Sequence, residues 1–229
     1  MKYRTVFGIV SASLCLSSHA QADSLWNLST SCETELALTA APTYVREKAG
    51  VYTLGKDGYD KVRASENGFV CMVVRGSEES LIPQCFDRIG QDVHVKVHKD
   101  EAKKLRAGMS FADVQKERAK GFFDGTYSTA KGHGVVYMAS DYNLVKFGDR
   151  LTRIAPHVMY HAPGVTNADI GSVPPQAFQN KGMPFIAGSG PMGFMISFTE
   201  KATDSTKADA ACKGELPDVT KYAPFPPNP

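Results

Sequence analysis

Two histidines four residues apart, His157 and His161, are the side chains whose spacing could bind a metal. On a helix they would share one face, as paired zinc ligands do. They lie within Pro156-His-Val-Met-Tyr-His-Ala-Pro163, where the flanking prolines and the branched and aromatic residues favour a strand. Along a strand the two rings would be about 13 Å apart, too far to share one ion. We therefore expect no metal site here.

His157 follows a proline at the expected start of this strand, near a sheet end, where functional sites often lie. We consider two roles for it: a structural histidine that holds the strand end by a hydrogen bond, and a functional group. The other histidines have simpler interpretations. His94 and His98 lie beside lysines, which indicates a solvated face, and His133 is expected in a loop between two glycines.

A complete catalytic constellation is missing from the sequence. Gly188-Ser189-Gly190 lacks the G-x-S-x-G spacing of a nucleophile elbow. We therefore expect a non-catalytic domain that binds a small molecule or an envelope component, with no cofactor. The alternative is a periplasmic hydrolase or a metal-assisted enzyme, in which His157 acts with a carboxylate such as Asp87 or Asp169.

The first 22 residues have the pattern of a secretory signal peptide. Lys2 and Arg4 precede a short apolar run, residues 6–16, and Ala20-Gln-Ala22 is typical of a cleavage site. The run is too short to span a bilayer, and no other apolar run approaches roughly 18 residues, so no membrane span is expected. We expect cleavage before Asp23 and a periplasmic or secreted mature protein.

The charges of the mature chain are balanced. Of the 26 Lys and Arg residues, Lys2 and Arg4 belong to the expected signal peptide, which leaves 24 against the 24 Asp and Glu residues. This balance gives no electrostatic reason to expect a nucleic acid as partner. Residues 23–216 are long enough for one globular domain, and the Pro-rich residues 217–229 predict an extended tail that does not continue a sheet.

Four cysteines follow the signal peptide, Cys32, Cys71, Cys85 and Cys212, and they allow three pairings. Disulfides are favoured over a metal site, because an exported chain meets an oxidising compartment and no C-x-x-C motif occurs. We expect Cys71 to pair with Cys85, which closes a small loop, and Cys32 to pair with Cys212, which ties the two ends together. No free thiol would then remain as a nucleophile.

The expected elements do not alternate regularly between helix and strand, which favours an α+β fold over a parallel α/β sheet. Asn67-Gly68 predicts a type I′ hairpin turn, so residues 51–75 are interpreted as an antiparallel β-meander. Ser110 and Asp113 form a capping-box pattern that begins a helix. Further strands are expected at 93–97, 134–139, 157–161, 185 and 194–198, and further helices at 31–41, 42–48 and 99–106.

Several short blocks, in this order, resemble a group of exported bacterial proteins of no assigned function. The main blocks are Asn67-Gly-Phe-Val-Cys71, Pro83-Gln-Cys85-Phe-Asp87 and Pro156-His-Val-Met159; Ala37-Leu-Thr-Ala-Ala-Pro42 and Tyr137-Met-Ala-Ser140 are similar to further ones. The resemblance covers most of the mature chain. It implies that Cys71 and Cys85 belong to one local unit, and it implies no activity.

Overall fold

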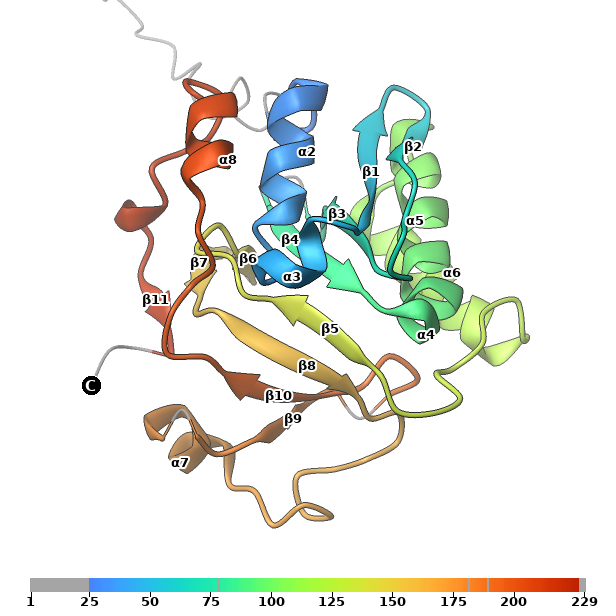
Figure 1. Ribbon diagram of the computed structural model, residues 1–229. Helices are drawn as coiled ribbons and strands as arrows, with labels where there is room; N and C mark the ends of the chain where they lie inside the picture. Colours follow the sequence, from blue (N-terminus) through green and yellow to red (C-terminus); the bar gives the residue numbers. More distant parts are fainter. Residues whose placement is uncertain (1–24, 78, 181, 189, 227–229) are drawn as a thin grey trace, which may run out of the picture.

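The structure, a computed structural model, describes residues 25–226 apart from 78, 181 and 189. The expected signal peptide lies outside these residues, as do the last three residues of the expected tail. A mixed eight-stranded sheet crosses the molecule, with helices against both of its faces (Figure 1). The α+β class is therefore confirmed. In the described part of the chain, no helix is long and apolar enough to cross a membrane.

The large sheet has the strand order β2-β1-β3-β4-β5-β8-β10-β9. Its strands are β1 (Gly50–Gly55), β2 (Gly58–Arg63), β3 (Val70–Val74), β4 (Ile82–Phe86), β5 (Val135–Met138), β8 (His157–His161), β9 (Phe185–Ala187) and β10 (Phe194–Phe198). A small sheet, in the order β11-β7-β6, consists of β6 (Leu144–Phe147), β7 (Arg150–Ile154) and β11 (Pro224–Phe225). The helices are α2 (Thr30–Leu38), α3 (Thr43–Arg46), α4 (Arg88–Gly90), α5 (Lys96–Arg106), α6 (Phe111–Phe123), α7 (Pro174–Gln179) and α8 (Thr206–Ala211).

The meander expected between residues 51 and 75 is wrong. β2 pairs with one side of β1, whereas β3 pairs in parallel with its other side. Asn67 does not adopt the positive φ that a type I′ turn needs. Its side chain instead donates to the Val45 carbonyl and accepts from the Phe69 amide. The hydrogen bonds of this amide side chain therefore hold the crossing between β2 and β3.

The strand expected at residues 93–97 is also wrong. Gln91–Val95 form a π-helical turn that continues into α5. Alternating valines fit a strand, but the wide turn places consecutive residues against the core, and residues 93–95 are all buried. Asp87 begins this helical segment, because its carboxylate accepts the Gly90 amide at the start of α4.

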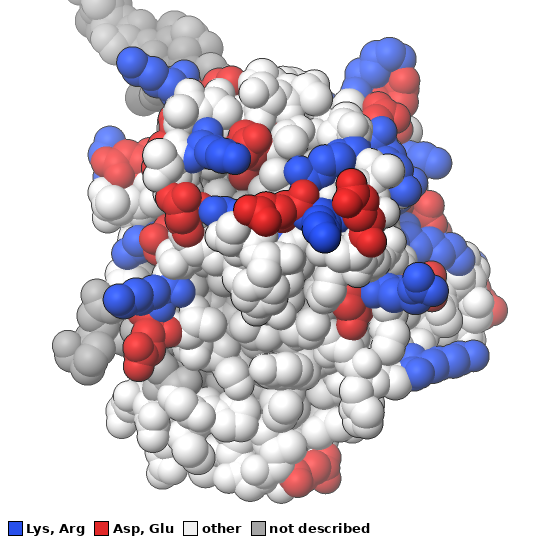
Figure 2. All heavy atoms as spheres, viewed as in Figure 1, with Lys and Arg blue, Asp and Glu red and all other residues white. Residues whose placement is uncertain are grey.

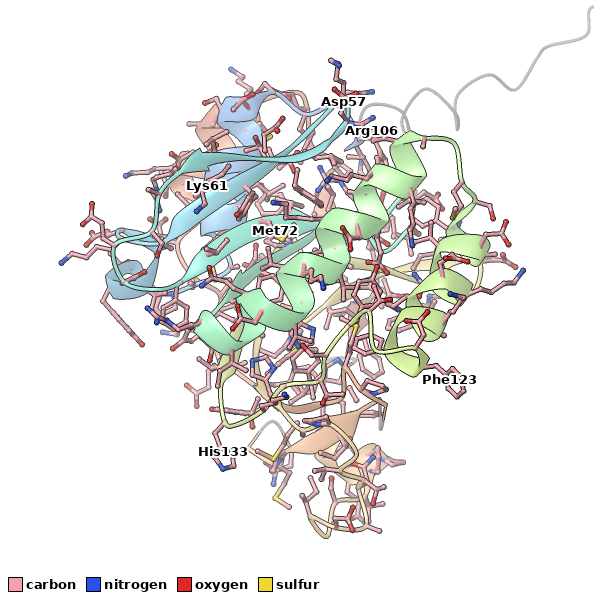
Figure 3. All side chains as sticks on the ribbon, turned by 90° about the vertical axis from the view of Figure 1, so that its right-hand side faces the viewer. Asp57, Lys61, Met72, Arg106, Phe123 and His133 are labelled. Carbon is pink, nitrogen blue, oxygen red and sulfur yellow. A yellow bond between two sulfur atoms is a disulfide. The ribbon has the colours of Figure 1, made fainter. Side chains whose placement is uncertain are left out.

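The two faces of the large sheet are covered differently. On one face, α2 packs on β1, β3 and β4. On the other face, α5 lies across the sheet with α6 beside it, and the small sheet and α7 cover β8, β9 and β10 (Figure 1, Figure 3). No described helix covers β8 and β10 on the α2 side (Figure 1). The sheet is therefore covered by helices on both faces at the end formed by β1, β3 and β4. At the end formed by β8 and β10, the face on the α2 side carries no described helix.

Both expected disulfides are confirmed. Cys71 and Cys85 occupy directly opposite positions of β3 and β4. Cys32 of α2 is joined to Cys212, which follows α8 and is 180 residues away. On the chain-entropy account, closing so long a loop is worth about 5 kcal/mol, against about 3 kcal/mol for the short loop. All four cysteines lie in the core cluster to which α2 contributes.

The two edges of the large sheet are protected from pairing with another chain. At β9, the Asn167 side chain accepts from the Ile186 amide at 2.8 Å and donates to the Ile186 carbonyl at 3.2 Å. It thereby replaces the two backbone bonds that a further strand would make. At the other edge, β2 exposes the charged side chains of Asp60 and Lys61.

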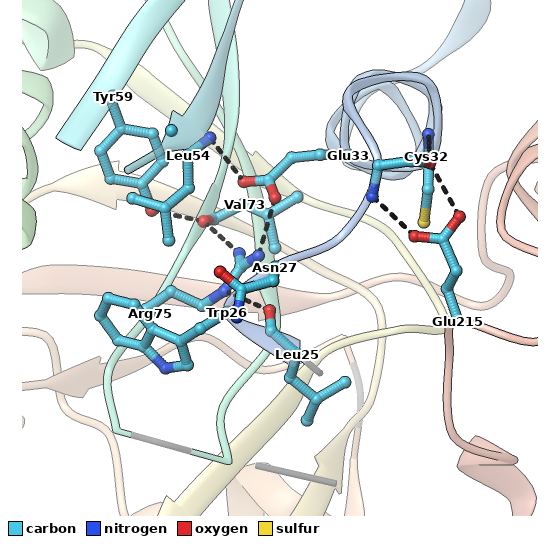
Figure 4. A network of polar contacts seen from close by, with 12 residues as sticks. Leu25, Trp26, Asn27, Cys32, Glu33, Leu54, Tyr59, Val73, Arg75 and Glu215 are labelled. Carbon is cyan, nitrogen blue, oxygen red and sulfur yellow. Dashed lines mark hydrogen bonds and ion pairs between the residues drawn. The ribbon is translucent and has the colours of Figure 1, made fainter. Parts of the chain in front are cut away.

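A buried ion pair connects α2 with the first strands. Glu33 of α2 and Arg75, which follows β3, lie 2.9 Å apart, and each side chain is 1% exposed (Figure 4). The other Glu33 oxygen accepts the Leu54 amide of β1, and Arg75 donates to the carbonyls of Val73 and Leu25. Burial raises the pKa of Glu33, and the Arg75 guanidinium opposes this rise.

Removing one partner of this pair should cost more than removing both. We expect Arg75→Met to lower the free energy of unfolding by about 3–5 kcal/mol, because the Glu33 charge is left buried without its partner. The double substitution Glu33→Leu with Arg75→Met should recover part of this loss. Urea unfolding followed by circular dichroism measures both variants. A double variant no more stable than the single one would contradict an electrostatic cause.

Candidate ligand cavity at strand β8

His157 begins β8, the strand expected at residues 157–161. It lies opposite Met138 of β5 and Phe198 of β10, and it is 2% exposed. Its ring meets the Phe198 ring edge to face, with 5.9 Å between centroids. Its Nδ1 lies 2.7 Å from the carbonyl oxygen of Ala155, just before the strand. This geometry matches the structural role considered above, in which a hydrogen bond holds the strand end.

The bond to Ala155 also determines the tautomer of His157. A carbonyl oxygen only accepts, so Nδ1 must carry the proton. Burial lowers the pKa of His157 from 6.5 to about 4, and the bond to Ala155 offsets this only in part. The ring is therefore neutral at pH 7, with Nε2 as an unprotonated acceptor. No described residue donates a hydrogen bond to Nε2.

His157 lines a cavity of about 370 Å³ between the large sheet and the small one. Five phenylalanines from five different elements share the wall: Phe147, Phe178, Phe185, Phe198 and Phe225. The remaining wall is almost entirely aliphatic or thioether: Ile82, Met138, Val145, Ile154, Met159, Ala187 and Ile196. The volume lies within the range of small-molecule sites.

The C-terminal tail forms part of this wall. The Phe225 ring lies 4.9 Å from that of Phe178, edge to face. The expectation that the tail does not continue a sheet is wrong for β11, which pairs with β7. The carbonyls of Ala223 and Phe225, on either side of Pro224, accept backbone amides of the β7 segment. The missing N–H of the proline is therefore not needed for this pairing.

Gln84 supplies the second polar group of the cavity wall. Its amide nitrogen lies 3.3 Å from Sδ of Met138, a weak acceptor, so its amide oxygen remains an acceptor. One row across β4, β5, β8 and β10 is formed by Gln84, Met138, His157 and Phe198. This row presents two neutral acceptors to the cavity, and no Asp, Glu, Lys or Arg side chain lines it.

Asp87 pairs with His161, at the opposite end of β8 from the cavity. Its Oδ1 lies 3.3 Å from Nε2 of His161, and its carboxylate accepts the amides of Gly90 and Val135. Partial burial would raise the pKa of Asp87, but these hydrogen bonds outweigh it and leave the pKa below 3.8. The close approach of the Asp87 carboxylate to the Val135 amide requires glycine at position 134, since a Cβ there would lie 2.2 Å from Oδ2 of Asp87.

His161 continues this chain of contacts to His94. The Nδ1 of His161 lies 3.2 Å from Nε2 of His94, and the two rings stack. The solvated position expected for His94 is wrong, because the π-helical turn directs it into the core, where it is 1% exposed between Phe86 and Phe194. Burial, reinforced by neighbouring histidines, lowers its pKa far below 6.5. Nδ1 of His94 is buried without a described hydrogen-bond partner.

The three candidate catalytic residues therefore do not meet. Neither carboxylate contacts His157: Asp87 is bound by His161, and Asp169 is exposed and accepts the amide and hydroxyl of Thr166. Sequence reasoning gave no means of connecting Asp87 with His161, since 74 residues separate them. It also missed the phenylalanine wall, whose members are spread over five elements.

Known proteins offer no further guide to this cavity. No described protein family, no curated protein and no solved structure matches the chain. Within residues 25–226, leaving out the three gaps, no group of three or more His, Cys, Asp and Glu side chains is arranged to hold a metal ion. The interpretation of the cavity therefore rests on its own geometry and chemistry.

We expect the free energy of unfolding to fall as the pH is lowered from about 6.5 to about 4. In this window the unfolded chain protonates His157 near its ordinary pKa of 6.5, whereas the folded protein resists protonation down to about 4. The unfolded state thus binds more protons, and acid favours it. For His157 alone the shift corresponds to about 3 kcal/mol, fully lost below both pKa values.

Urea unfolding at several pH values within this window measures the effect. His157→Asn should flatten the dependence on pH, and the slope that remains is expected from His94, whose pKa is lowered by the same cause. A variant that keeps the full wild-type slope would contradict a buried, neutral His157.

Proposed function

We propose that this protein is a non-catalytic binding protein for a small, uncharged and largely apolar molecule, which is held in the cavity beside His157. The observation that carries the proposal is the wall itself: five phenylalanines from separate elements surround about 370 Å³ together with one buried, neutral histidine. Such a combination of apolar lining with a few directed polar groups is typical of ligand sites.

The chemistry of the wall restricts the ligand. Burying apolar surface contributes about 25 cal/mol per Å², so a ligand that buries about 200 Å² gains roughly 5 kcal/mol. A charged group would lose its hydration without meeting an opposite charge, because no Asp, Glu, Lys or Arg side chain lines the cavity and His157 is neutral. Nε2 of His157 and Oε1 of Gln84 are acceptors, which favours a ligand with a hydroxyl or N–H donor on an aromatic or acyl body.

The proposal places this binding protein outside the cytoplasm. Two disulfides fit an oxidising compartment, and the first 22 residues have the composition of a secretory signal peptide. An envelope component with an apolar body would match both the compartment and the cavity. A periplasmic or secreted location remains part of this proposal.

The enzyme alternative has less support in the geometry. His157 lacks a carboxylate partner among the described residues, so nothing there would raise its basicity. Both ring nitrogens of His161 are engaged, one with Asp87 and the other with His94. A histidine held in this way has no lone pair left to take a proton from a substrate.

A neutral fluorescent probe tests the cavity. N-phenylnaphthylamine is apolar and carries one N–H, and phenylnaphthalene is a matched probe without it. We expect the mature protein to bind both. His157→Phe should weaken binding of the amine roughly fivefold, the value of about 1 kcal/mol for one hydrogen bond, and should leave binding of the hydrocarbon nearly unchanged.

Two tryptophan variants locate the binding. Ala187→Trp fills the cavity and should abolish binding of both probes. Ala210→Trp, at an exposed position of α8, serves as the matched control and should bind as the wild type does. Binding that survives in Ala187→Trp, or a wild-type protein that binds neither probe, would contradict the proposed site.

A further inference from the structure

A second cavity, of about 420 Å³, lies between α2, α3, the end of β2 and the start of α8. It shares no wall residue with the cavity beside His157, and its volume also falls within the range of small-molecule sites. We call it the charged cleft, because its wall contains six charged side chains: Arg46, Arg63, Lys207, Glu35, Glu47 and Asp204. Its chemistry is therefore the opposite of that of the phenylalanine-lined cavity.

The charged cleft belongs to a surface on which charges of both signs alternate. Figure 2 shows Lys and Arg side chains interleaved with Asp and Glu side chains over the upper half of this side of the molecule, where α2, α3 and α8 lie in Figure 1. The cleft itself has three basic and three acidic side chains, so its formal charge is zero. A purely anionic or purely cationic ligand would meet like charges there, whereas a ligand with charges of both signs can match both.

The opposite charges of the charged cleft hardly pair with one another. Nη2 of Arg46 lies 3.5 Å from Oδ2 of Asp204, whose side chain is 62% exposed, and an ion pair so exposed contributes little stability. Within residues 25–226, apart from the three gaps, no side chain forms a hydrogen bond or an ion pair with Glu35, Glu47 or Lys207. Two carboxylates and one ammonium group of the wall are therefore available to a ligand.

The two arginines of the charged cleft are held in place by backbone carbonyls. Arg63 donates from Nε to the Ala49 carbonyl at 2.6 Å and from Nη2 to the Arg46 carbonyl at 2.5 Å. Arg46 in turn donates from Nη1 to the Asp204 carbonyl, also at 2.6 Å. Because these side chains are ordered before a ligand arrives, binding does not have to immobilise them.

A covalent bond holds the two helical walls of the charged cleft together. The disulfide joins Cys32 of α2 to Cys212, which follows α8. At the other end of this helix pair, the Thr203 hydroxyl donates to the carbonyl of Thr39, the C-cap of α2. The two helices are thus fixed at both ends, and they keep the charges that they contribute to the cleft at a constant spacing.

We propose that the charged cleft binds a small zwitterion, a molecule that carries both an ammonium and a carboxylate group, as amino acids and short peptides do. The carboxylate of the ligand pairs with Lys207 and the two arginines, and its ammonium group pairs with Glu35 and Glu47. These contacts are charge-assisted hydrogen bonds, which are stronger than those between neutral groups. Leu38 and Ala208, two apolar residues of the same wall, offer contact to the body of the ligand.

A nuclear magnetic resonance titration of the isotope-labelled mature protein with alanyl-alanine tests the proposal. We expect saturable changes of the amide chemical shifts in the charged cleft. N-acetyl-alanyl-alanine lacks the ammonium group and alanyl-alanine amide lacks the carboxylate. Each should bind roughly tenfold more weakly, the effect of one lost hydrogen bond between charged groups. Free alanine distinguishes the sources of the ligand: binding as tight as that of the dipeptide indicates amino acids, and weaker binding indicates peptides.

Two substitutions assign the two ends of the ligand. Lys207→Gln should reduce the preference for alanyl-alanine over its amide, and Glu35→Gln should reduce the preference over the acetylated dipeptide. Each variant should keep the other preference. Lys213→Gln and Glu66→Gln are the matched controls, because these exposed residues do not line the charged cleft, and both should bind as the wild type does.

Circular dichroism of each variant establishes that it remains folded. A wild-type protein that binds both blocked dipeptides as tightly as alanyl-alanine, or that shows no shift changes in the charged cleft, would overturn the proposal. A folded Lys207→Gln or Glu35→Gln variant with the full wild-type preferences would overturn it as well. The apolar probes are directed at a different cavity, so the two binding proposals can fail separately.

Discussion

The buried pair of Glu33 and Arg75 is the interaction on which the arrangement of the first half of the protein depends. Two charges withdrawn from water cost several kcal/mol each, and this cost is met only when every donor and acceptor has a partner. Here the partners come from separate segments: the Leu54 amide of β1, the Val73 carbonyl of β3 and the Leu25 carbonyl before α2. These segments must therefore come together as one unit.

The need to satisfy this buried pair explains why β3 pairs with β1, an arrangement that local sequence signals do not indicate. Glu33 accepts from β1 while Arg75 extends from the end of β3, so satisfying the pair brings β3 beside β1 instead of beside β2. Tyr59 of β2 donates its hydroxyl to the same Val73 carbonyl that Arg75 uses, and it thereby ties the edge strand to this polar cluster. Both cysteine pairs lie in the core cluster formed by α2, β1 and β3, and they stabilise the unit further.

The sequence was sufficient for features that depend on residues close together in the chain, or on a small number of possible pairings. Ser110 caps α6, residues 157–161 form a strand, and the disulfide pairing is one of three possibilities. It was not sufficient for features that depend on long-range contacts. The valines at 93–97 alternate as in a strand, yet the aromatic layer of Phe86 and Phe194 and the N-cap at Asp87 favour a helical turn.

The candidate site shows the same limit. His157 was correctly placed at a strand end, because proline and the branched residues around it are local signals. Its surroundings are not local: the phenylalanines of the cavity range from β6 to the C-terminal tail, and none of them has a spacing that relates it to His157. The partner of Asp87 was missed for the same reason, since a carboxylate gives no indication of which of several histidines will approach it.

The two histidines of β8 have a common structural consequence for the cavity, because they hold the two ends of the strand that lines it. In a strand, a shift of one residue exchanges the side chains of the two faces. His157 is bound to Ala155 at the start of β8, and His161 is bound to Asp87 and His94 at its end. With both ends held, Met159 must face the cavity and Tyr160 the opposite side of the sheet. The four-residue spacing that suggested a metal site thus fixes the register of the strand that presents His157 and Met159 to the cavity.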